Sequence, residues 1–287
     1  MVERVLELSR KAAGVFEERG FENPRLEAEL LLAGVLGMRR LDLYLQHDRP
    51  LSPDELDRYR GAVRRRLKHE PLQYVLGTAA FRHLELAVDR RVLIPRPETE
   101  VLVGLVLDWA VARPRPKRAL DIGTGSGAIA LSLAAEGGFD DIVATDISAD
   151  ALSVASVNAG RSGLDGQVEF RRGSLFDAVA GEQFTVVVSN PPYIADADRD
   201  TLAPEVRDHE PALALFGGAT GLDLVRALIE AAPAHLETGG LLALELGLDQ
   251  GAAVLALLES TGAFSGARIV ADLTGRPRFA LAERVAL

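Results

Sequence analysis

The stretch ALDIGTGSGAIALSLAAEG, residues 119–137, runs from a short apolar segment through a glycine-rich loop into a helix-like segment. Glycine tolerates positive φ angles and lets the backbone approach a ligand closely, and the helix that follows presents free N–H groups. At the carboxyl edge of a doubly wound sheet, such a loop is where nucleotide-like ligands bind. The stretch therefore predicts an α/β fold with a ligand site at this loop, although such glycines can also serve only to turn a strand into a helix.

Strand-like and helix-like segments alternate on the C-terminal side of this loop. Apolar runs typical of buried strands lie at residues 141–147, 167–173, 184–190 and 241–247. The intervening segments have helical spacing, and short apolar strands separated by amphipathic helices indicate a parallel sheet covered on both faces. The tail, residues 267–285, predicts two further strands around a turn that contains glycine.

The first 70 residues predict a small helical domain. The pair Asn23–Pro24 predicts the start of a helix that ends at Gly37, with Asn as the cap. Ser52 and Glu55 predict a capping box that starts another helix, over about residues 53–68. In the first segment, apolar residues recur at intervals of three and four, at Val2, Val5, Leu6, Leu8, Ala12, Ala13 and Phe16.

The two halves of the chain are joined by a segment with a different period. Between residues 75 and 94 apolar positions alternate with period two, which predicts a β-hairpin that links the domains. Helical spacing returns over residues 98–112, and Pro114 and Pro116 then break the chain. The expected domains are an N-terminal helical domain over residues 1–72, a hairpin linker over 73–95 and a larger domain over 96–287.

Composition excludes several classes of protein. The chain has 287 residues and no cysteine, so it has no disulfide framework, thiolate zinc site or cysteine nucleophile. Its five histidines show no metal-ligand spacing, and we expect no metal. The first residues lack the basic-then-apolar pattern of a signal peptide, and no apolar run reaches the roughly 18–20 residues that span a bilayer. We therefore expect a cytoplasmic protein with no membrane partner.

The formal net charge of −10 is unevenly distributed. Residues 1–90 contain 16 Lys and Arg against 15 Asp and Glu, whereas residues 91–287 contain 16 against 27, a net charge of −11. Neutralising nucleic-acid phosphates requires concentrated positive charge, so the larger domain is a poor candidate for a duplex-binding surface. The basic run Arg64–Lys68 is either a docking patch for an anionic partner or a solvated helix end, which favours cations.

The glycine loop does not match the phosphate-binding fingerprints. The sequence has no G-x-x-x-x-G-K-[ST] pattern there, and Ala128 occupies the last position of G-x-G-x-x-G. Preceded by Asp121, the G-x-G-x-G spacing instead resembles motif I of class I S-adenosylmethionine-dependent methyltransferases. The resemblance places Asp121 near the methionine end of the cofactor; alternatively, Asp121 holds the N–H groups of the loop. Asp146 ends the next strand, where a carboxylate can accept both ribose hydroxyls of an adenosyl group. Asp146 could instead cap the helix that follows, but Ser148 competes for that position, so we favour the ligand role for Asp146.

A second motif, Asn190-Pro191-Pro192-Tyr193, follows the predicted strand 184–189. Two prolines fix φ and remove two N–H donors, so the nearby carbonyls are not used up in regular secondary structure. Alone, this turn would be an ordinary strand terminator. After the fourth strand of a methyltransferase-like sheet, it resembles the NPP[YF] motif of enzymes that methylate planar nitrogens.

The chemistry of a planar nitrogen explains such a motif, because its lone pair is shared with a π system. If the Asn190 side-chain oxygen and the Pro191 carbonyl accept its two N–H bonds, the growing positive charge is stabilised. Tyr193 can stack on the planar group. Methyl transfer then depends on position and electrostatics, with no metal and no strong base required.

Further segments narrow the family. The chain resembles the HemK/PrmC protein-glutamine N5-methyltransferases, which modify the glutamine of the Gly-Gly-Gln motif in class 1 peptide-chain release factors. The resemblance implies a Rossmann-like, mostly parallel seven-stranded sheet, an N-terminal helical domain that recognises substrate, and S-adenosyl-L-methionine as methyl donor, with S-adenosyl-L-homocysteine as product. It is carried by Glu70–Gly77, Phe81, Val92–Glu100, Asp121–Gly127, Asp146, Asn190–Tyr193, Glu210–Leu213, Gly217–Gly218 and Gly239–Gly247.

The resemblance also assigns site residues. It implies that Asn190, Pro191 and Tyr193 are catalytic, and that these three bind substrate together with Pro192. The chain departs from the family pattern at Ser174, Leu175 and Arg82–His83. Arg96 and Thr99 either contact substrate or have a structural role. The implied cofactor-binding residues are Gly123, Thr124, Gly125, Ser126, Gly127, Asp146, Leu175 and Asn190.

Two other functions compete with this one. An adenine-N6 DNA or guanine-N2 RNA methyltransferase would apply the same Asn-Pro-Pro-Tyr residues to a flipped base, but it predicts a basic cleft. The net charge of −11 over residues 91–287 argues against a direct nucleic-acid substrate. A non-catalytic binding module has no need of the intact motif. We therefore expect a protein partner, a class 1 release factor.

Overall fold

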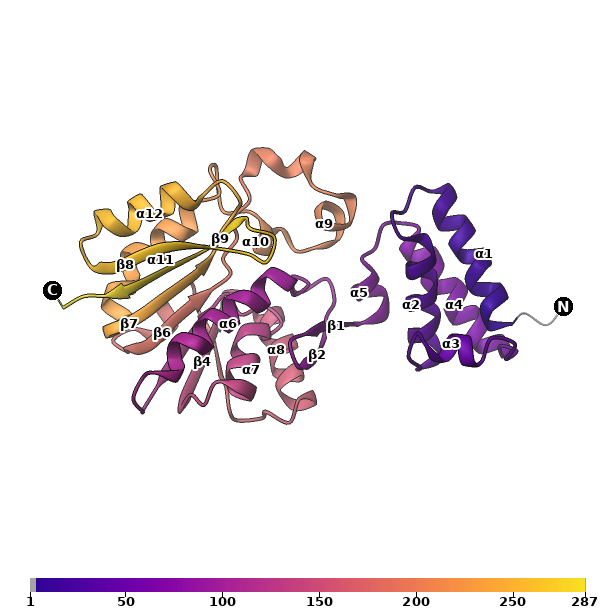
Figure 1. Ribbon diagram of the computed structural model, residues 1–287, viewed down its shortest axis with the longest axis horizontal. Coiled ribbons are helices and arrows are strands. Elements are labelled where there is room, and N and C mark those ends of the chain that lie inside the picture. The colour runs from indigo at the N-terminus through magenta and orange to yellow at the C-terminus, as the bar shows by residue number, and fades with distance from the viewer. Residues whose placement is uncertain (1–3, 287) are drawn as a thin grey trace. The chain divides into compact units, whose positions relative to one another are not determined.

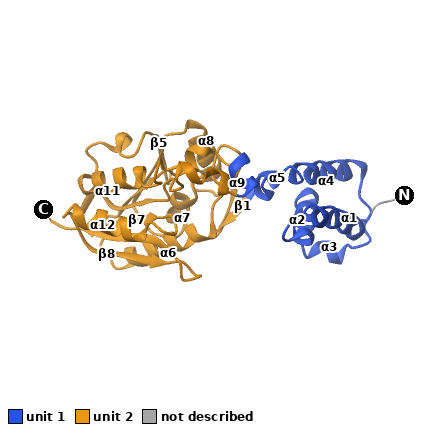
Figure 2. Ribbon diagram, turned by 90° about the horizontal axis from the view of Figure 1, so that it is seen from above, with its two compact units in different colours: residues 1–78, 203–209 blue, residues 79–202, 210–287 orange. Residues whose placement is uncertain are grey.

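The computed structural model describes residues 4–286, so Val2 of the predicted first helix lies outside the described residues. The chain forms two compact units (Figure 2). The smaller unit comprises the described residues up to Thr78 together with Ala203–His209, and the larger comprises Ala79–Leu202 and the described residues from Glu210 onward. The internal segment Ala203–His209 thus belongs to the same unit as the N-terminal helices, which no local sequence pattern indicated.

The smaller unit is helical, as predicted. Leu8, Ala12 and Phe16 of the first helix are buried, at the spacing that predicted its apolar face. They pack with Leu31 and Tyr59 of two further helices. The helices are α1 (Val5–Glu18), α2 (Pro24–Leu36), α3 (Asp42–Leu45), α4 (Pro53–Arg66), α5 (Leu72–Leu76) and, from the later segment, α9 (Pro204–His209).

All three predicted helix signals in this unit lie at helix ends. The Ser52 hydroxyl accepts the Glu55 N–H at 3.2 Å and the Glu55 carboxylate accepts the Ser52 N–H at 2.8 Å, which is the predicted capping box. Gly37 ends α2 in the left-handed region, with φ of 64°. Asn23 occupies the N-cap position of α2 and Pro24 begins the helix, as predicted, but the Asn23 side chain makes no capping hydrogen bond.

The basic run at the end of α4 is not uniformly solvated. Arg64 and Lys68 are exposed, but Arg66 is buried. The Arg66 guanidinium forms ion pairs with Glu27 of α2 at 2.6 Å and with Glu205 of α9 at 2.5 Å. Arg66 therefore helps to join residues 203–209 to the smaller unit, and it is not available as part of a surface patch.

The predicted hairpin is present but shorter than its sequence pattern. The strands are β1 (Thr78–Phe81) and β2 (Leu84–Ala87), which pair as a two-stranded sheet. The start of the pattern belongs to α5, which Gly77 ends with φ of 79°. Val92 and Ile94 lie beyond β2 in irregular structure, yet they are buried. The apolar alternation in the sequence therefore continues beyond β2, because alternate residues there are buried without belonging to a strand.

The larger unit contains a seven-stranded sheet in the order β5-β4-β3-β6-β7-β9-β8 (Figure 1). The first five strands in this order pair in parallel, and β9 runs antiparallel to both β7 and β8. This is the mostly parallel sheet that the sequence predicted, with the two tail strands at its edge. The strands are β3 (Arg118–Ile122), β4 (Asp141–Asp146), β5 (Glu169–Arg172), β6 (Phe184–Ser189), β7 (Leu236–Glu245), β8 (Phe264–Ala271) and β9 (Pro277–Arg284).

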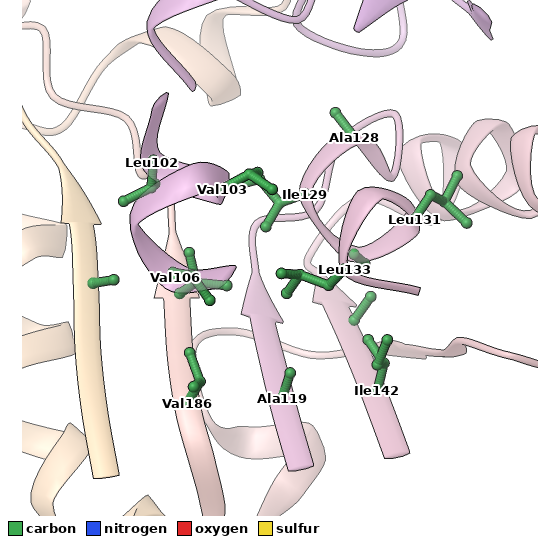
Figure 3. Packing of buried hydrophobic residues seen from close by; sticks show 14 of the residues in the cluster. Leu102, Val103, Val106, Ala119, Ala128, Ile129, Leu131, Leu133, Ile142 and Val186 are labelled. Atoms are coloured by element: carbon green, nitrogen blue, oxygen red, sulfur yellow. The ribbon is translucent and has the colours of Figure 1, made fainter. Parts of the chain in front are cut away.

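Helices cover both faces of this sheet. On one face, α6 (Pro97–Val111), α7 (Ala128–Glu136) and α8 (Ala149–Arg161) pack on side chains such as Ala119 and Val186 (Figure 3). On the other, α11 (Asp223–His235) and α12 (Gly251–Ser260) pack on the alternate residues, such as Leu120 and Val187. Successive strand residues point to opposite faces, so the strands are apolar throughout. The remaining short helices are η1 (Asp177–Val179), η2 (Asp196–Thr201) and α10 (Ala212–Leu215).

Residues 4–286 contain neither a membrane-spanning helix nor a cluster of metal ligands. No helix in this range is long and apolar enough to cross a membrane. In the same part of the chain, His, Asp and Glu side chains form no group of three or more that would hold a metal ion.

Candidate active site

The glycine loop connects β3 to α7 at the carboxyl edge of the sheet. Gly123, Gly125 and Gly127 have φ angles of 73°, 55° and 84°, the left-handed region that favours glycine. The loop is anchored to the neighbouring strand, because the N–H groups of Gly123 and Thr124 both donate to the carbonyl of Thr145, at 2.8 and 3.0 Å. A side chain at Gly123 or Gly125 would meet no atom within 4 Å, so these two residues face open space.

That open space is a cavity of about 200 Å³ formed by residues of the larger unit. The carboxyl ends of β3, β4 and β6 contribute to its wall, as expected for a ligand site in a parallel sheet. Among its lining residues are Gly123, Gly125, Asp146, Ser148, Ser174, Leu175, Asn190, Pro191, Pro192, Pro211, Leu213 and Ala214.

Asp146 ends β4 and lines the cavity. One carboxylate oxygen accepts the N–H of Gly125 at 3.0 Å and the other accepts the N–H of Ser148 at 2.9 Å. Burial raises the pKa of the Asp146 carboxyl, and the backbone N–H groups of Ser148 and Gly125 act against that rise. The Ser148 hydroxyl caps α8 by accepting the N–H of Ala151 at 3.1 Å. Asp146 is therefore not the helix cap and remains available to a ligand.

Asp121 lies beneath the loop and is fully buried. One oxygen, Oδ2, accepts the Thr124 hydroxyl at 2.6 Å and the Ala130 N–H at 3.2 Å. The other, Oδ1, has no hydrogen-bond partner among the described residues. Burial raises the pKa of the Asp121 carboxyl to about 7. Asp121 does not line the cavity, and it holds the loop through the Thr124 hydroxyl and the first turn of α7 and not through the N–H groups of the loop.

Three of the predicted cofactor residues support the cavity without lining it. Thr124 is buried against Asp121, and Ser126 is buried with its carbonyl accepting the side-chain amide of Asn158 at 2.9 Å. A side chain at Gly127 would approach Leu131 to 3.0 Å. Their positions indicate that they shape the loop, and their predicted contact with a cofactor stays a prediction.

Leu175 lies in the segment that follows β5. It lines the cavity together with Ser174 and has an unusual φ of 49°. The preceding Gly173 donates its N–H to the Asp146 carbonyl at 3.1 Å, which ties this segment to the end of β4. The cavity is therefore lined by an aliphatic side chain, Leu175, as well as by the acidic side chain of Asp146.

The Asn-Pro-Pro-Tyr turn directly follows β6. Asn190, Pro191 and Pro192 line the cavity, so the structure brings them together with Gly125 and Asp146. Tyr193 is not among the lining residues. Its hydroxyl accepts a hydrogen bond from Arg278 of β9 at 2.9 Å, and the Arg278 guanidinium lies 5.1 Å from the ring centre.

Sequence reasoning missed Glu245 and Arg278, which lie behind this turn. Glu245 ends β7 with no exposed surface, and Arg278 donates to its Oε1 at 3.1 Å. Thr99 of α6 donates its hydroxyl to Glu245 Oε2 at 2.7 Å and accepts the side-chain N–H of Asn190 at 3.1 Å. An acidic residue inside the apolar run LLALELG was the available sequence signal for Glu245.

Glu210 begins the stretch Glu210–Leu213, which is one of the segments that carry the family resemblance. Its buried carboxylate accepts the Ile94 N–H at 3.2 Å and a guanidinium hydrogen bond from Arg96 at 2.6 Å. Arg96 is thus engaged in the structural role that the sequence left open. Pro211 and Leu213, which follow Glu210 in the chain, line the cavity.

A mostly parallel seven-stranded sheet with an antiparallel β9, carrying a glycine loop and an Asn-Pro-Pro-Tyr turn at its carboxyl edge, defines a class I methyltransferase. Residues 7–77 match the family model described as PrmC N-terminal domain, and residues 102–206 match the methyltransferase small domain. The chain belongs to the release factor glutamine methyltransferase family.

Curated relatives support this assignment along almost the whole chain. The release factor glutamine methyltransferase of Geobacter sulfurreducens is 45% identical over 91% of this chain and 89% of its own length. That of Deinococcus radiodurans is 42% identical over 97% and 98% of the two chains. A methyltransferase crystal structure from Pyrococcus furiosus has a TM-score of 0.53 at 20% identity, covering 71% of this chain and 90% of that one, and shares the fold.

Proposed function

We propose that this enzyme transfers a methyl group from S-adenosyl-L-methionine to the side-chain amide nitrogen, N5, of the glutamine in the Gly-Gly-Gln motif of class 1 release factors. One observation carries the proposal. Asn190 and Pro191 of the nitrogen-methylation motif line the same cavity as Gly125 and Asp146 of the cofactor motifs. The methyl donor and the acceptor nitrogen can therefore meet inside one pocket. Relatives at 40–45% identity are named release factor glutamine methyltransferase.

The cavity residues fit S-adenosylmethionine. Gly123 and Gly125 leave open space where side chains would project, so a ligand can lie directly on the backbone. The two Asp146 oxygens accept the N–H groups of Gly125 and Ser148, and a carboxylate has about four lone-pair sites, so Asp146 can still accept a ribose hydroxyl. Leu175 offers an aliphatic surface to the adenine. When bound, the cofactor supplies an electrophilic methyl group on a sulfonium sulfur.

Asn190 and Pro191 would position the glutamine. The Asn190 side-chain nitrogen is engaged by Thr99, so its oxygen Oδ1 is left to accept one amide N–H of the substrate. Pro191 provides a backbone carbonyl for the other N–H. Two acceptors stabilise the positive charge that grows on nitrogen and aim its lone pair at the methyl carbon. The nitrogen gains the methyl carbon as the carbon–sulfur bond breaks, and afterwards it loses one proton to solvent.

The smaller unit would bind the body of the release factor, because a Gly-Gly-Gln loop by itself offers little contact area. On this unit, Arg19, Arg64, Arg65 and Lys68 line a shallow hollow. A cluster of exposed basic side chains favours an acidic protein surface and increases the rate of encounter. Replacing Arg64 and Lys68 by glutamate should raise KM for the whole release factor while kcat changes little.

The decisive assay uses labelled S-adenosylmethionine with purified release factor, its Gly-Gly-Gln variant with Gln→Ala, and total nucleic acid. Label should appear on the release factor alone and disappear in the Gln→Ala variant. Label on nucleic acid would favour the adenine or guanine methyltransferase instead. Label that persists on the Gln→Ala protein would show that a different residue is modified.

A further inference from the structure

We infer that Glu245 and Thr99 form a positioning relay that fixes the orientation of the Asn190 amide toward the substrate. The inference rests on the proposed function and identifies residues that determine its rate without touching substrate. Glu245 ends β7, Thr99 lies in the first turn of α6, and Asn190 follows β6, so three separate elements meet here.

The direction of each hydrogen bond follows from the chemistry of its groups. An ionised carboxylate only accepts, so the hydroxyl proton of Thr99 must point to Glu245 Oε2, 2.7 Å away. Its oxygen then has only lone pairs left for Asn190. The group of Asn190 at 3.1 Å from that oxygen must therefore be the amide nitrogen. The carbonyl oxygen Oδ1 is thereby left for the cavity, where an acceptor is required.

Burial raises the pKa of the Glu245 carboxyl, and the Thr99 hydroxyl and the Arg278 guanidinium act against that rise and favour the ionised form. The Arg278 guanidinium donates to Glu245 Oε1 at 3.1 Å, and both side chains are buried. The same nitrogen donates to the Tyr193 hydroxyl at 2.9 Å. One buried cation therefore contacts both the origin of the relay and the last residue of the Asn-Pro-Pro-Tyr turn.

The relay matters because an asparagine amide can rotate by half a turn at little cost in shape. In the reversed orientation the amide N–H groups would face the substrate amide, which also presents N–H groups, and the stabilising acceptor would be lost. Thr99 is only 4% exposed and Glu245 is fully buried, so water does not substitute readily for either group. The Thr99 hydroxyl and both oxygens of Glu245 have partners, which favours a single arrangement of these groups, whereas Arg278 Nε has no partner among the described residues.

The test compares Thr99→Val, which keeps the shape but removes the hydroxyl, with Thr99→Ser, which restores it. Thr99→Val should lower kcat about ten-fold, the equivalent of about 1.4 kcal/mol, with unchanged affinity for S-adenosylmethionine. Thr99→Ser should recover most of the rate. The matched control is Thr185→Val, since Thr185 is also a buried threonine that accepts a backbone N–H and donates to a glutamate, but at the far end of β6.

A double-mutant comparison separates the relay from a merely structural role. If Thr99 acts through Asn190, adding Thr99→Val to Asn190→Ala should cost no further rate. Glu245→Gln provides a second route, because a glutamine amide can donate to Thr99 and so permit the reversed orientation of Asn190. This variant should also lower kcat, and again not in the Asn190→Ala background.

The inference is overturned if a folded Thr99→Val enzyme keeps its wild-type kcat. It is equally overturned if Thr99→Val lowers kcat by the same factor in the Asn190→Ala enzyme as in the wild-type enzyme. If the Thr99→Val variant does not fold, Glu245→Gln is used for the same comparison. Failure of the proposed function is seen separately, in the identity of the substrate that wild type labels. The ratio of variant to wild-type rate is then measured on that substrate.

Discussion

Replacing Asp121 by asparagine should stabilise the protein increasingly as pH rises. Burial raises the pKa of this carboxyl to about 7 from an ordinary 3.8, and its Oδ1 has no partner among the described residues. Between these two pH values the folded state keeps a proton that the unfolded state has lost. The contribution of Asp121 to the stability of wild type is therefore greatest below pH 3.8 and is lost as the pH rises through about 7.

The size of this effect follows from the pKa difference. At about 1.36 kcal/mol per pKa unit, a rise of about three units corresponds to about 4 kcal/mol of stability lost by wild type. Asparagine is neutral in both states and avoids the loss. Of the range from pH 6 to pH 8, about one pH unit lies below the pKa of the folded state, so the stability difference should widen by about 1 kcal/mol over this range.

Urea unfolding followed by tryptophan fluorescence measures this difference. The chain has one tryptophan, Trp109 in α6, so the signal reports the unit that contains Asp121. Asp272→Asn is a suitable control. Hydrogen bonds from Thr274 and Arg276 hold the pKa of the Asp272 carboxyl well below its usual range, so this group stays ionised throughout pH 6–8. A stability difference for Asp121→Asn that is the same at both pH values would refute the reasoning.

Three further predictions concern the site and the helices. Asn190→Ala should remove about 3 kcal/mol of transition-state stabilisation and so lower kcat roughly a hundred-fold, while the affinity for S-adenosylmethionine stays nearly unchanged. A rate near that of wild type would show that Asn190 is only a turn residue. Asp146→Asn should weaken S-adenosylmethionine binding about ten-fold by calorimetry, because a charge-assisted acceptor is lost. Gly127→Ala should lower the melting temperature, since φ of 84° and a Cβ 3.0 Å from Leu131 together cost about 1–2 kcal/mol or more.

Local signals in the sequence predicted the elements of the larger unit well. The Ser148 cap, the glycine turns of the loop and the apolar strands depend on residues close together in the chain, which is why local reasoning found them. Prediction was weaker where burial comes from distant segments. The period-two pattern that includes Val92 and Ile94 extended beyond β2, because these side chains are buried without belonging to a strand.

The site shows the same division. The sequence by itself determined that a glycine loop, an acid after the next strand and an Asn-Pro-Pro-Tyr turn would meet at one sheet edge, since parallel strands bring their carboxyl ends together. Only the tertiary structure decided which of these groups reach the cavity. Thr124 and Tyr193 turn away from it, toward Asp121 and Arg278 respectively.

The tertiary structure also decided how the amide of Asn190 is oriented. That orientation depends on Thr99, 91 residues earlier, and on Glu245, 146 residues after Thr99. No periodicity or spacing encodes a hydrogen bond between residues so far apart. A hydrogen-bond chain has a direction only when a buried carboxylate, a hydroxyl and an amide are packed together without water, and packing of that kind exists only in the folded protein.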